Sequence, residues 1–166
     1  MGKGINYILI GMPGSGKSTI GVLLAKALAY EFIDTDLLIQ QKEGKLLKEI
    51  IEEKGNEGFR LIEEEVNTGV SPKEAVIAPG GSAIYSSKAM EHFREIGKVI
   101  YLRLSYEATK ERLGDLQERG VLLKDGQTLE DLYNERTPLY EQYAHIIIDT
   151  DGLEIGDALE KVLENL

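Results

Sequence analysis

The sequence contains no cysteine and only two histidines, His92 and His145, among its 166 residues. Without cysteine, disulfides and thiolate metal sites are excluded, and two histidines far apart in the sequence disfavour a histidine-rich metal site. No apolar run is long enough to cross a bilayer, and the N-terminus lacks the apolar core of a signal peptide. We therefore expect a cytoplasmic protein that has no membrane partner.

Positive charge is also scarce, with 19 Lys and Arg against 29 Asp and Glu and a formal net charge of -10. An acidic surface repels a nucleic-acid backbone, so we expect no nucleic-acid partner. ATP remains possible, because backbone N–H groups and a few cations can form a positive pocket within an acidic protein. The length, with 42% hydrophobic and 29% charged residues, predicts a single globular domain over residues 1–166. We expect this domain to be a monomer.

The segment Gly11–Ser18 reads GMPGSGKS and matches G-x-x-x-x-G-K-[ST], the phosphate-binding P-loop. The apolar, β-prone run Tyr7–Ile10 precedes it, and apolar residues at helical spacing follow it, so the loop joins a strand to a helix as the motif requires. A glycine-rich turn that binds nothing is the alternative. The expected nucleotide-binding residues are Gly14, Ser15, Gly16, Lys17, Ser18 and Thr19.

The chemistry of this loop follows from its residue types. Its glycines allow the backbone to aim N–H groups at phosphate oxygens, and the helix that follows adds the positive end of its dipole. Lys17 can neutralise the β- and γ-phosphates, and the hydroxyl of Ser18 can hold Mg²⁺. The expected cofactors are therefore ATP and Mg²⁺.

Short apolar runs alternate with segments of helical periodicity along the whole chain, which predicts βαβ units and an α/β fold with a parallel sheet. Right-handed crossovers place helices on both faces of such a sheet, and its ligand-binding loops gather at the carboxyl ends of the strands. The five predicted strands are Ile5–Ile10, Tyr30–Ile33, Ala75–Ala78, Val99–Leu104 and His145–Ile148.

Two segments are predicted to be irregular. Asn67–Lys73, which contains Gly69 and Pro72, is expected to be a surface connection. Gly114–Gln127 contains three glycines and Arg119, and it is a candidate lid over the nucleotide, since a closing segment needs hinges and a cation. An ordinary loop between two helices is the alternative for this second segment.

The rest of the chain narrows the class of P-loop protein. The chain is short for an ATPase motor, and the N-K-x-D signature of GTPases is absent. Asp34 and Asp36 follow the second predicted strand, where two carboxylates can serve a metal and a substrate hydroxyl together. Asp34 would orient Mg²⁺ through water, and Asp36 would accept hydrogen bonds from the attacking substrate. The alternative is that Asp34 or Thr35 only caps the helix that follows.

Two weaker patterns come next in the chain. Arg60 stands three residues before Glu63 on a predicted helix, a spacing that often forms only a surface ion pair. Gly80 and Gly81 follow the third predicted strand and allow a ligand to approach the backbone closely, although a plain tight turn explains them equally well.

In order and spacing, these segments together resemble the shikimate kinase family almost from end to end. The resemblance implies a three-layer P-loop fold like that of nucleoside monophosphate kinases. It also implies transfer of the ATP γ-phosphate to the 3-hydroxyl of shikimate, a small acid with three hydroxyls, in aromatic amino-acid biosynthesis. The matching segments are GMPGSGKS, IDTD at Ile33–Asp36, FRLIEEE at Phe59–Glu65, Gly80-Gly81, ERTPLYEQYA at Glu135–Ala144 and IIIDTDG at Ile146–Gly152.

The resemblance also implies roles for single residues. Asp36 would hold the hydroxyls of shikimate, while Arg60 and Arg136 would bind its carboxylate, a task that suits the planar guanidinium fork. Arg112 would pack on the adenine, and Arg119 would reach the transferring phosphoryl group. The implied catalytic residues are Lys17, Asp36 and Arg119, and the implied substrate-binding residues are Asp36, Arg60, Gly80, Gly81, Ser82 and Arg136.

The chain departs from the family pattern at three places, one of which is Pro79, a less usual residue just before the glycines. Ser82 stands where the family usually has a third consecutive glycine, and its side chain is expected to narrow the substrate pocket or add a hydrogen bond. Gly120 stands where the family usually has proline, which loosens the backbone beside Arg119. Two alternatives to shikimate kinase stay open: a related kinase for another polyhydroxy acid, such as a gluconate-like sugar acid, and a nucleotide-binding module without catalysis.

Overall fold

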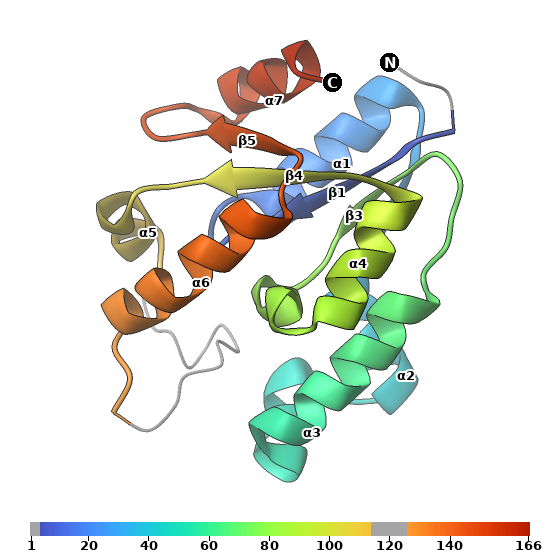
Figure 1. Ribbon diagram of the computed structural model, residues 1–166, viewed down its shortest axis with the longest axis vertical. Coiled ribbons are helices and arrows are strands. Elements are labelled where there is room, and N and C mark those ends of the chain that lie inside the picture. The colour runs from blue at the N-terminus through green and yellow to red at the C-terminus, as the bar shows by residue number, and fades with distance from the viewer. Residues whose placement is uncertain (1–3, 114–125) are drawn as a thin grey trace.

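The computed structural model describes residues 4–113 and 126–166. Their strands form one five-stranded, fully parallel sheet, in the order β2-β3-β1-β4-β5 (Figure 1). Each predicted run overlaps one strand, and the sheet confirms the predicted α/β class. The strands are β1 (Asn6–Ile10), β2 (Glu31–Asp34), β3 (Ala75–Ala78), β4 (Gly97–Arg103) and β5 (Ile146–Asp149).

The middle of the sheet is apolar on both faces, as expected for strands that helices cover on each side. All residues of β1 and β3 are buried. Along β1, Ile8 and Ile10 face one side, while Tyr7 and Leu9 face the other. This continuous apolar pattern, rather than strict alternation, identified these strands in the sequence.

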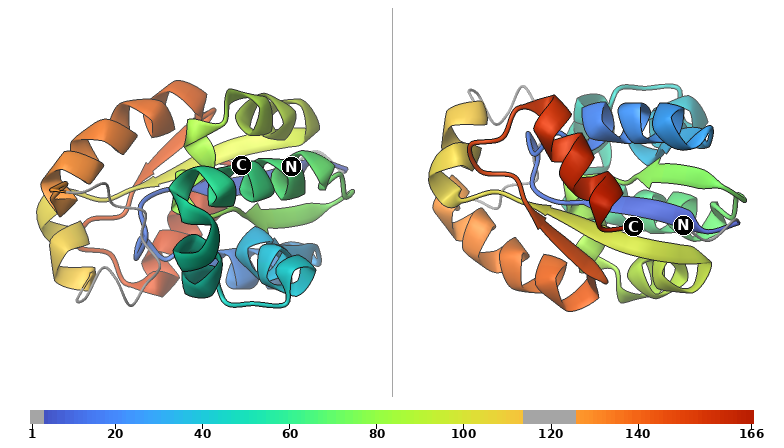
Figure 2. Two further views of the ribbon diagram at one scale, coloured as in Figure 1. Left: turned by 90° about the horizontal axis from the view of Figure 1, so that it is seen from below. Right: turned by 90° about the horizontal axis from the view of Figure 1, so that it is seen from above.

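Helices cover both faces of the sheet, as Figure 2 shows from two sides. Helices α1 (Lys17–Leu28) and α7 (Ile155–Glu164) pack on the face of Tyr7 and Leu9. Helices α4 (Ser87–Ile96) and α6 (Leu129–Tyr143) pack on the opposite face. The result is the three-layer arrangement that the alternation of strands and helices predicts.

Four further helical elements complete the described chain. Helices α2 (Thr35–Glu43) and α3 (Leu47–Gly69) pack together around a small core of their own. The short 3-10 helix η1 (Gly81–Tyr85) follows β3, and α5 (Tyr106–Arg112) follows β4. Helix α3 is broken at Gly55, whose φ of +72° lies in the left-handed region.

One predicted boundary is wrong. The surface connection expected at Asn67–Lys73 begins later, because α3 continues to Gly69 and the side chain of Asn67 is fully buried. Glycine is tolerated in the last turn of a helix, so Gly69 marks its end rather than the start of a loop. Within the described residues, no helix is both long and apolar enough to span a membrane. The predicted lid lies largely outside the described residues, which include only Gly126 and Gln127 of it and exclude Arg119.

Candidate active site

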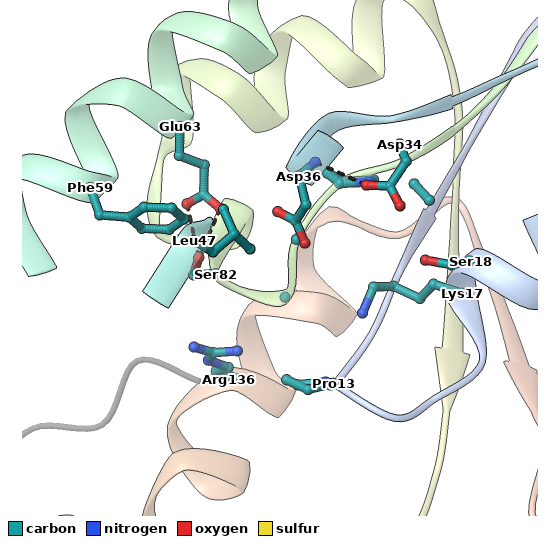
Figure 3. Close-up of a pocket in the computed structure, with 14 residues that line it drawn as sticks. Pro13, Lys17, Ser18, Asp34, Asp36, Leu47, Phe59, Glu63, Ser82 and Arg136 are labelled. Atoms are coloured by element: carbon teal, nitrogen blue, oxygen red, sulfur yellow. Dashed lines mark hydrogen bonds between the residues drawn. The ribbon is translucent and has the colours of Figure 1, made fainter. Parts of the chain in front are cut away.

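A pocket lies at the carboxyl ends of β1, β2 and β3, where the topology of the sheet predicts a ligand site (Figure 3). The P-loop, the start of α2, the middle of α3, η1 and α6 all contribute side chains to it. The residues that line the pocket are Pro13, Lys17, Ser18, Asp34, Asp36, Leu47, Phe59, Glu63, Ala78, Pro79, Gly80, Gly81, Ser82 and Arg136.

The P-loop joins the buried strand β1 to helix α1 and leaves the first turn of that helix open to a ligand. Gly14 and Gly16 have φ of +80° and +90°, conformations that glycine adopts without strain. Gly16 is the N-cap of α1; no side chain caps this end, and the first turn contains no acidic residue. Unpaired N–H groups and the positive end of the helix dipole therefore fit a phosphate at this place.

The ammonium group of Lys17 points into the pocket (Figure 3) and donates to the backbone oxygens of Gly11 at 3.0 Å and Met12 at 3.3 Å. Burial lowers the pKa of Lys17 to about 8, and the positive charge of Arg136 adds to this effect. The carboxylates of Asp36 and Asp34 oppose the shift without cancelling it. A bound polyphosphate would bring negative charge close to this ammonium group and so favour its charged form.

Asp34 and Asp36 stand at the junction of β2 and α2. Oδ1 of Asp34 accepts hydrogen bonds from the backbone N–H groups of Asp36 at 2.9 Å and Leu37 at 3.3 Å, so the capping role is confirmed for Asp34. The same residue also lines the pocket together with Ser18. Mg²⁺ prefers oxygen ligands, and the hydroxyl of Ser18 and the carboxylate of Asp34 supply them. This fits a magnesium ion that is bound partly by phosphates.

Asp36 extends into the pocket from the first turn of α2. Burial raises the pKa of Asp36 to about 6; the negative charge of Asp34 adds to this, and Lys17 opposes it. The carboxylate is therefore mostly ionised at neutral pH. In that state it can only accept hydrogen bonds, as a group that orients a substrate hydroxyl must.

Gly80 and Gly81 are needed for close approach rather than for a tight turn. Gly80 has φ of −62°, which any residue can adopt, so the turn itself does not require glycine. A Cβ atom at Gly80 would lie 2.7 Å from Oδ1 of Asp36 and 3.1 Å from Oε2 of Glu63. At Gly81 it would lie 2.8 Å from Nη1 of Arg136. The two glycines thus let three charged side chains approach the backbone.

Glu63 does not form the surface ion pair with Arg60 that their spacing suggested. Its side chain is buried, and the hydroxyl of Ser82 donates to this carboxylate. Burial raises the pKa of Glu63 to about 7; the Ser82 hydrogen bond and the two arginines, Arg136 and Arg60, lower it in part, while Asp36 raises it further. The hydrogen bond expected of Ser82 is therefore present, and its partner is an acid at the pocket wall.

The arginines expected at the site lie at three different places. Arg136 lines the pocket and is 1% exposed. Arg60 lies in an adjoining pocket, which it shares with Glu63, Ser82 and Tyr85. Exposed Arg112 donates to the backbone oxygen of Gly14 at 3.3 Å, beside the P-loop. The structure thus brings Arg136 to Lys17 and Asp36, and it leaves Arg60 behind the pocket wall.

Two of the residues expected to bind the nucleotide, Ser15 and Thr19, differ in their exposure to solvent. Ser15 is buried, whereas Thr19 is exposed on α1. Sequence reasoning missed six residues that line the pocket: Pro13, Leu47, Phe59, Glu63, Ala78 and Pro79. For Glu63 a signal existed, because its neighbours Phe59 and Ile62 mark the buried face of α3. For Leu47 and Pro13 the sequence offers no comparable signal.

Comparison with known proteins agrees with this geometry. The family model for shikimate kinase matches residues 13–166. A shikimate kinase of Moorella thermoacetica is 37% identical over 163 residues, which cover 97% of this chain and 94% of the relative. The solved shikimate kinase of Acinetobacter baumannii in complex with shikimate has a TM-score of 0.89 at 35% identity, with 97% of this chain and 92% of that chain covered. A gluconokinase of Sinorhizobium meliloti is 15% identical, with a TM-score of 0.59 and 99% and 92% covered, a likeness that shows the fold alone.

Proposed function

This chain belongs to the shikimate kinase family, and on that basis we propose that it transfers the γ-phosphate of ATP to the 3-hydroxyl of shikimate. The products are ADP and shikimate 3-phosphate, with the hydroxyl proton released. One observation carries the proposal: a P-loop lysine, Lys17, and a buried arginine, Arg136, face the same pocket. The lysine suits a polyphosphate and the arginine suits a carboxylate, so the pocket offers sites for both substrates.

The P-loop supports binding of the phosphates of ATP. The N–H groups of Gly14, Ser15, Gly16 and the first turn of α1 would surround the phosphate oxygens, with Lys17 between the β- and γ-phosphates. Thr19 is exposed beside this turn, where it can contact the nucleotide. Arg112, which holds the backbone of Gly14, would pack on the adenine.

Magnesium would be held by Ser18 and, through water, by Asp34, with phosphates and water supplying the other ligands. When bound, this ion neutralises charge on the phosphates and orients them. In the described part of the chain, no cluster of three or more acidic or histidine side chains is placed to hold a metal ion alone. This agrees with a metal site that is completed by the nucleotide.

The acceptor hydroxyl would be oriented by Asp36, and the carboxylate of shikimate would pair with Arg136. Gly80, Gly81 and Ser82 form the wall beside them, where Gly80 allows the side chains of Asp36 and Glu63 to lie close to the backbone. Arg60 would act on the carboxylate from behind this wall. Binding in this way holds the hydroxyl oxygen in line with the γ-phosphorus, which is the main requirement for a loose transition state.

In the transfer step, a bond forms between the 3-hydroxyl oxygen of shikimate and the γ-phosphorus. The bond from that phosphorus to the oxygen bridging to the β-phosphate breaks, and its electrons stay with ADP. Lys17 is placed to stabilise the charge that develops on the phosphates. Asp36 accepts the hydrogen bond of the attacking hydroxyl and orients it.

Some expectations stay predictions. These are the role of Arg119 at the phosphoryl group, a lid at residues 114–127, the single-domain organisation, the monomeric state and the cytoplasmic location. The resemblance to solved shikimate kinases over 97% of the chain agrees with one domain.

The proposed function is tested by ADP release from ATP and Mg²⁺ with a panel of hydroxy acids that includes shikimate and gluconate. We expect shikimate to give the highest kcat/KM by several orders of magnitude. Release that is equally fast without an acceptor, or with gluconate, would contradict the assignment. We expect Lys17→Met to be inactive. Lys26→Met is the matched control, because Lys26 lies on the last turn of α1, far along the helix from the P-loop.

A further inference from the structure

Tyr85, the last residue of η1, contacts both arginines of the proposed carboxylate site. Its ring centroid lies 4.4 Å from Cζ of Arg60 on α3 and 5.4 Å from Cζ of Arg136 on α6. Its hydroxyl accepts a hydrogen bond from Nε of Arg136 at 3.4 Å and donates one to Oε1 of Glu135 at 2.6 Å. A single side chain in the adjoining pocket therefore connects three elements of the fold: η1, α3 and α6.

Besides this ring, the described chain offers the two arginines few partners, although Arg136 also shares a hydrogen bond with the side chain of Tyr140. Among residues 4–113 and 126–166, neither Arg60 nor Arg136 forms an ion pair with a carboxylate. Nε of Arg60 is buried without a hydrogen-bond partner in the same part of the chain. A buried cation without an anion is costly, and the face of an aromatic ring offsets part of that cost.

The hydroxyl of Tyr85 also accepts the hydrogen bond of Nε of Arg136. Because it occupies Nε, a carboxylate can pair only with the two terminal nitrogens of the guanidinium group. One of these, Nη1, is the atom that a Cβ at Gly81 would meet at 2.8 Å, so it lies against the pocket wall. Tyr85 thus leaves the fork of Arg136 directed at the pocket.

We propose that Tyr85 is a positioning residue that holds Arg60 and Arg136 in the orientation that binds the carboxylate of the acceptor substrate. The inference rests on the proposed function, since it takes shikimate as that substrate. It assigns Tyr85 no contact with the reacting atoms. The residue would act on substrate binding through the two guanidinium groups, and ATP binding would be independent of it.

The test compares Tyr85→Phe and Tyr85→Leu with the unchanged protein, using initial rates over a range of shikimate and ATP concentrations. Tyr85→Phe keeps the ring and loses only the hydroxyl, so we expect KM for shikimate to rise about threefold. Tyr85→Leu loses the ring as well, and we expect a rise of about tenfold to a hundredfold, a range typical of one or two desolvated cation–π contacts. In both variants kcat should change less than twofold, and KM for ATP should be unchanged.

Tyr143→Phe is the matched control, since Tyr143 lies on α6 and packs on the same core away from the pocket. Its kinetic constants should equal those of the unchanged protein. A second acceptor, the methyl ester of shikimate, separates positioning from folding because it has no carboxylate. With the ester, Tyr85→Leu should cause no further loss beyond that of the ester itself.

The outcomes distinguish the two proposals. An unchanged protein that phosphorylates shikimate supports the proposed function on its own. If Tyr85→Leu then keeps the normal KM for shikimate, or loses equally with acid and ester, the positioning role is overturned and the function stands. An unchanged protein that is inactive with shikimate overturns the proposed function and this inference together. A Tyr85→Leu protein that does not fold leaves the test to Tyr85→Phe, whose normal KM would likewise overturn the role.

Discussion

The hydroxyl oxygen of Ser82 lies 2.9 Å from both carboxylate oxygens of Glu63, at the wall of the candidate active-site pocket. The hydrogen bond joins η1 to α3 across this wall. Gly80 lies beside the pair, between Glu63 and Asp36. Two acids with raised pKa values, about 7 and about 6, therefore flank the same glycine.

These raised pKa values predict how stability depends on pH. A carboxyl group whose pKa is higher in the folded protein than in the unfolded chain stabilises the fold at low pH, and this contribution is lost as the pH rises through the folded value. For Glu63 the pKa rises from 4.5 to about 7, equivalent to about 3 kcal/mol. Glutamine does not titrate, so we expect Glu63→Gln to lose less stability than the unchanged protein between pH 5.5 and pH 8, both measured without ligand.

The measurement is urea unfolding of the unchanged protein and of Glu63→Gln at both pH values. Glu57→Gln, an exposed position on the same helix, is the matched control and should keep the normal pH dependence. If Glu63→Gln and the unchanged protein lose the same stability between pH 5.5 and 8, Glu63 does not titrate as its burial indicates.

The buried charge of Lys17 is expected to lower the stability of the ligand-free protein while it serves the activity. Its pKa is lowered to about 8, so the folded, ligand-free protein binds this proton more weakly than the unfolded chain does. The resulting penalty is present at pH 7 and is relieved as the pH rises through 8. We expect Lys17→Met to abolish measurable transfer, to raise the stability of the ligand-free protein at pH 7 by about 1–3 kcal/mol, and to remove the stabilisation by ATP.

Thermal unfolding with and without ATP, together with ADP release, measures all three effects of Lys17→Met. Lys26→Met should retain both activity and stabilisation by ATP. Loss of stability in the Lys17 variant at pH 7 would mean that its hydrogen bonds to Gly11 and Met12 outweigh the burial of its charge.

The close approach at Gly80 predicts a loss of function from a single methyl group. A Cβ there would lie 2.7 Å from Oδ1 of Asp36, so Gly80→Ala must displace the carboxylate that we propose orients the acceptor. We expect kcat/KM for shikimate to fall about a hundredfold, as a small misplacement of reacting groups can cause. Gly156→Ala is the matched control, since a Cβ at that position on α7 meets nothing within 4 Å. Equal kinetics for the two variants would show that Asp36 tolerates the displacement.

The sequence predicts the fold well because two features that indicate it, the buried apolar runs and the P-loop motif, are local in the sequence. The buried runs at β1 and β3 need no tertiary information, and the P-loop fixes where β1 ends and α1 begins. The pairing of Glu63 with Ser82 could not be predicted in this way. The two residues lie on different elements, 19 positions apart, and the spacing of Glu63 with Arg60 favoured another partner. Spacing along a helix shows which residues share a face, but not which element packs against that face.

Tyr85 shows the same limit. Nothing in the sequence around it indicates a contact with Arg60 or Arg136, because those residues lie 25 and 51 positions away on α3 and α6. The fold brings all three together beside the wall that separates the two adjoining pockets. Resemblance to the family identified the two arginines, and only the structure shows how each is oriented.

The last prediction separates the two arginines by their placement. Arg136 is 1% exposed and lines the pocket, whereas Arg60 lies in the adjoining pocket behind Glu63 and Ser82. A charge-assisted pair with the carboxylate of shikimate should therefore be stronger at Arg136, with a loss of about 2–5 kcal/mol on truncation. We expect Arg136→Met to weaken shikimate binding by more than a hundredfold, and Arg60→Met to weaken it by about tenfold.

Calorimetric titration of shikimate and of ATP, each into both variants, tests this order. Affinity for ATP should be nearly unchanged in either variant, because neither arginine belongs to the P-loop. Arg94→Met, on the outer surface of α4, is the matched control and should bind both ligands normally. An equal loss at the two arginines would show that Arg60 also contacts the carboxylate when shikimate is bound. Equal losses for ATP and shikimate would show that the arginines support the fold rather than the acceptor site.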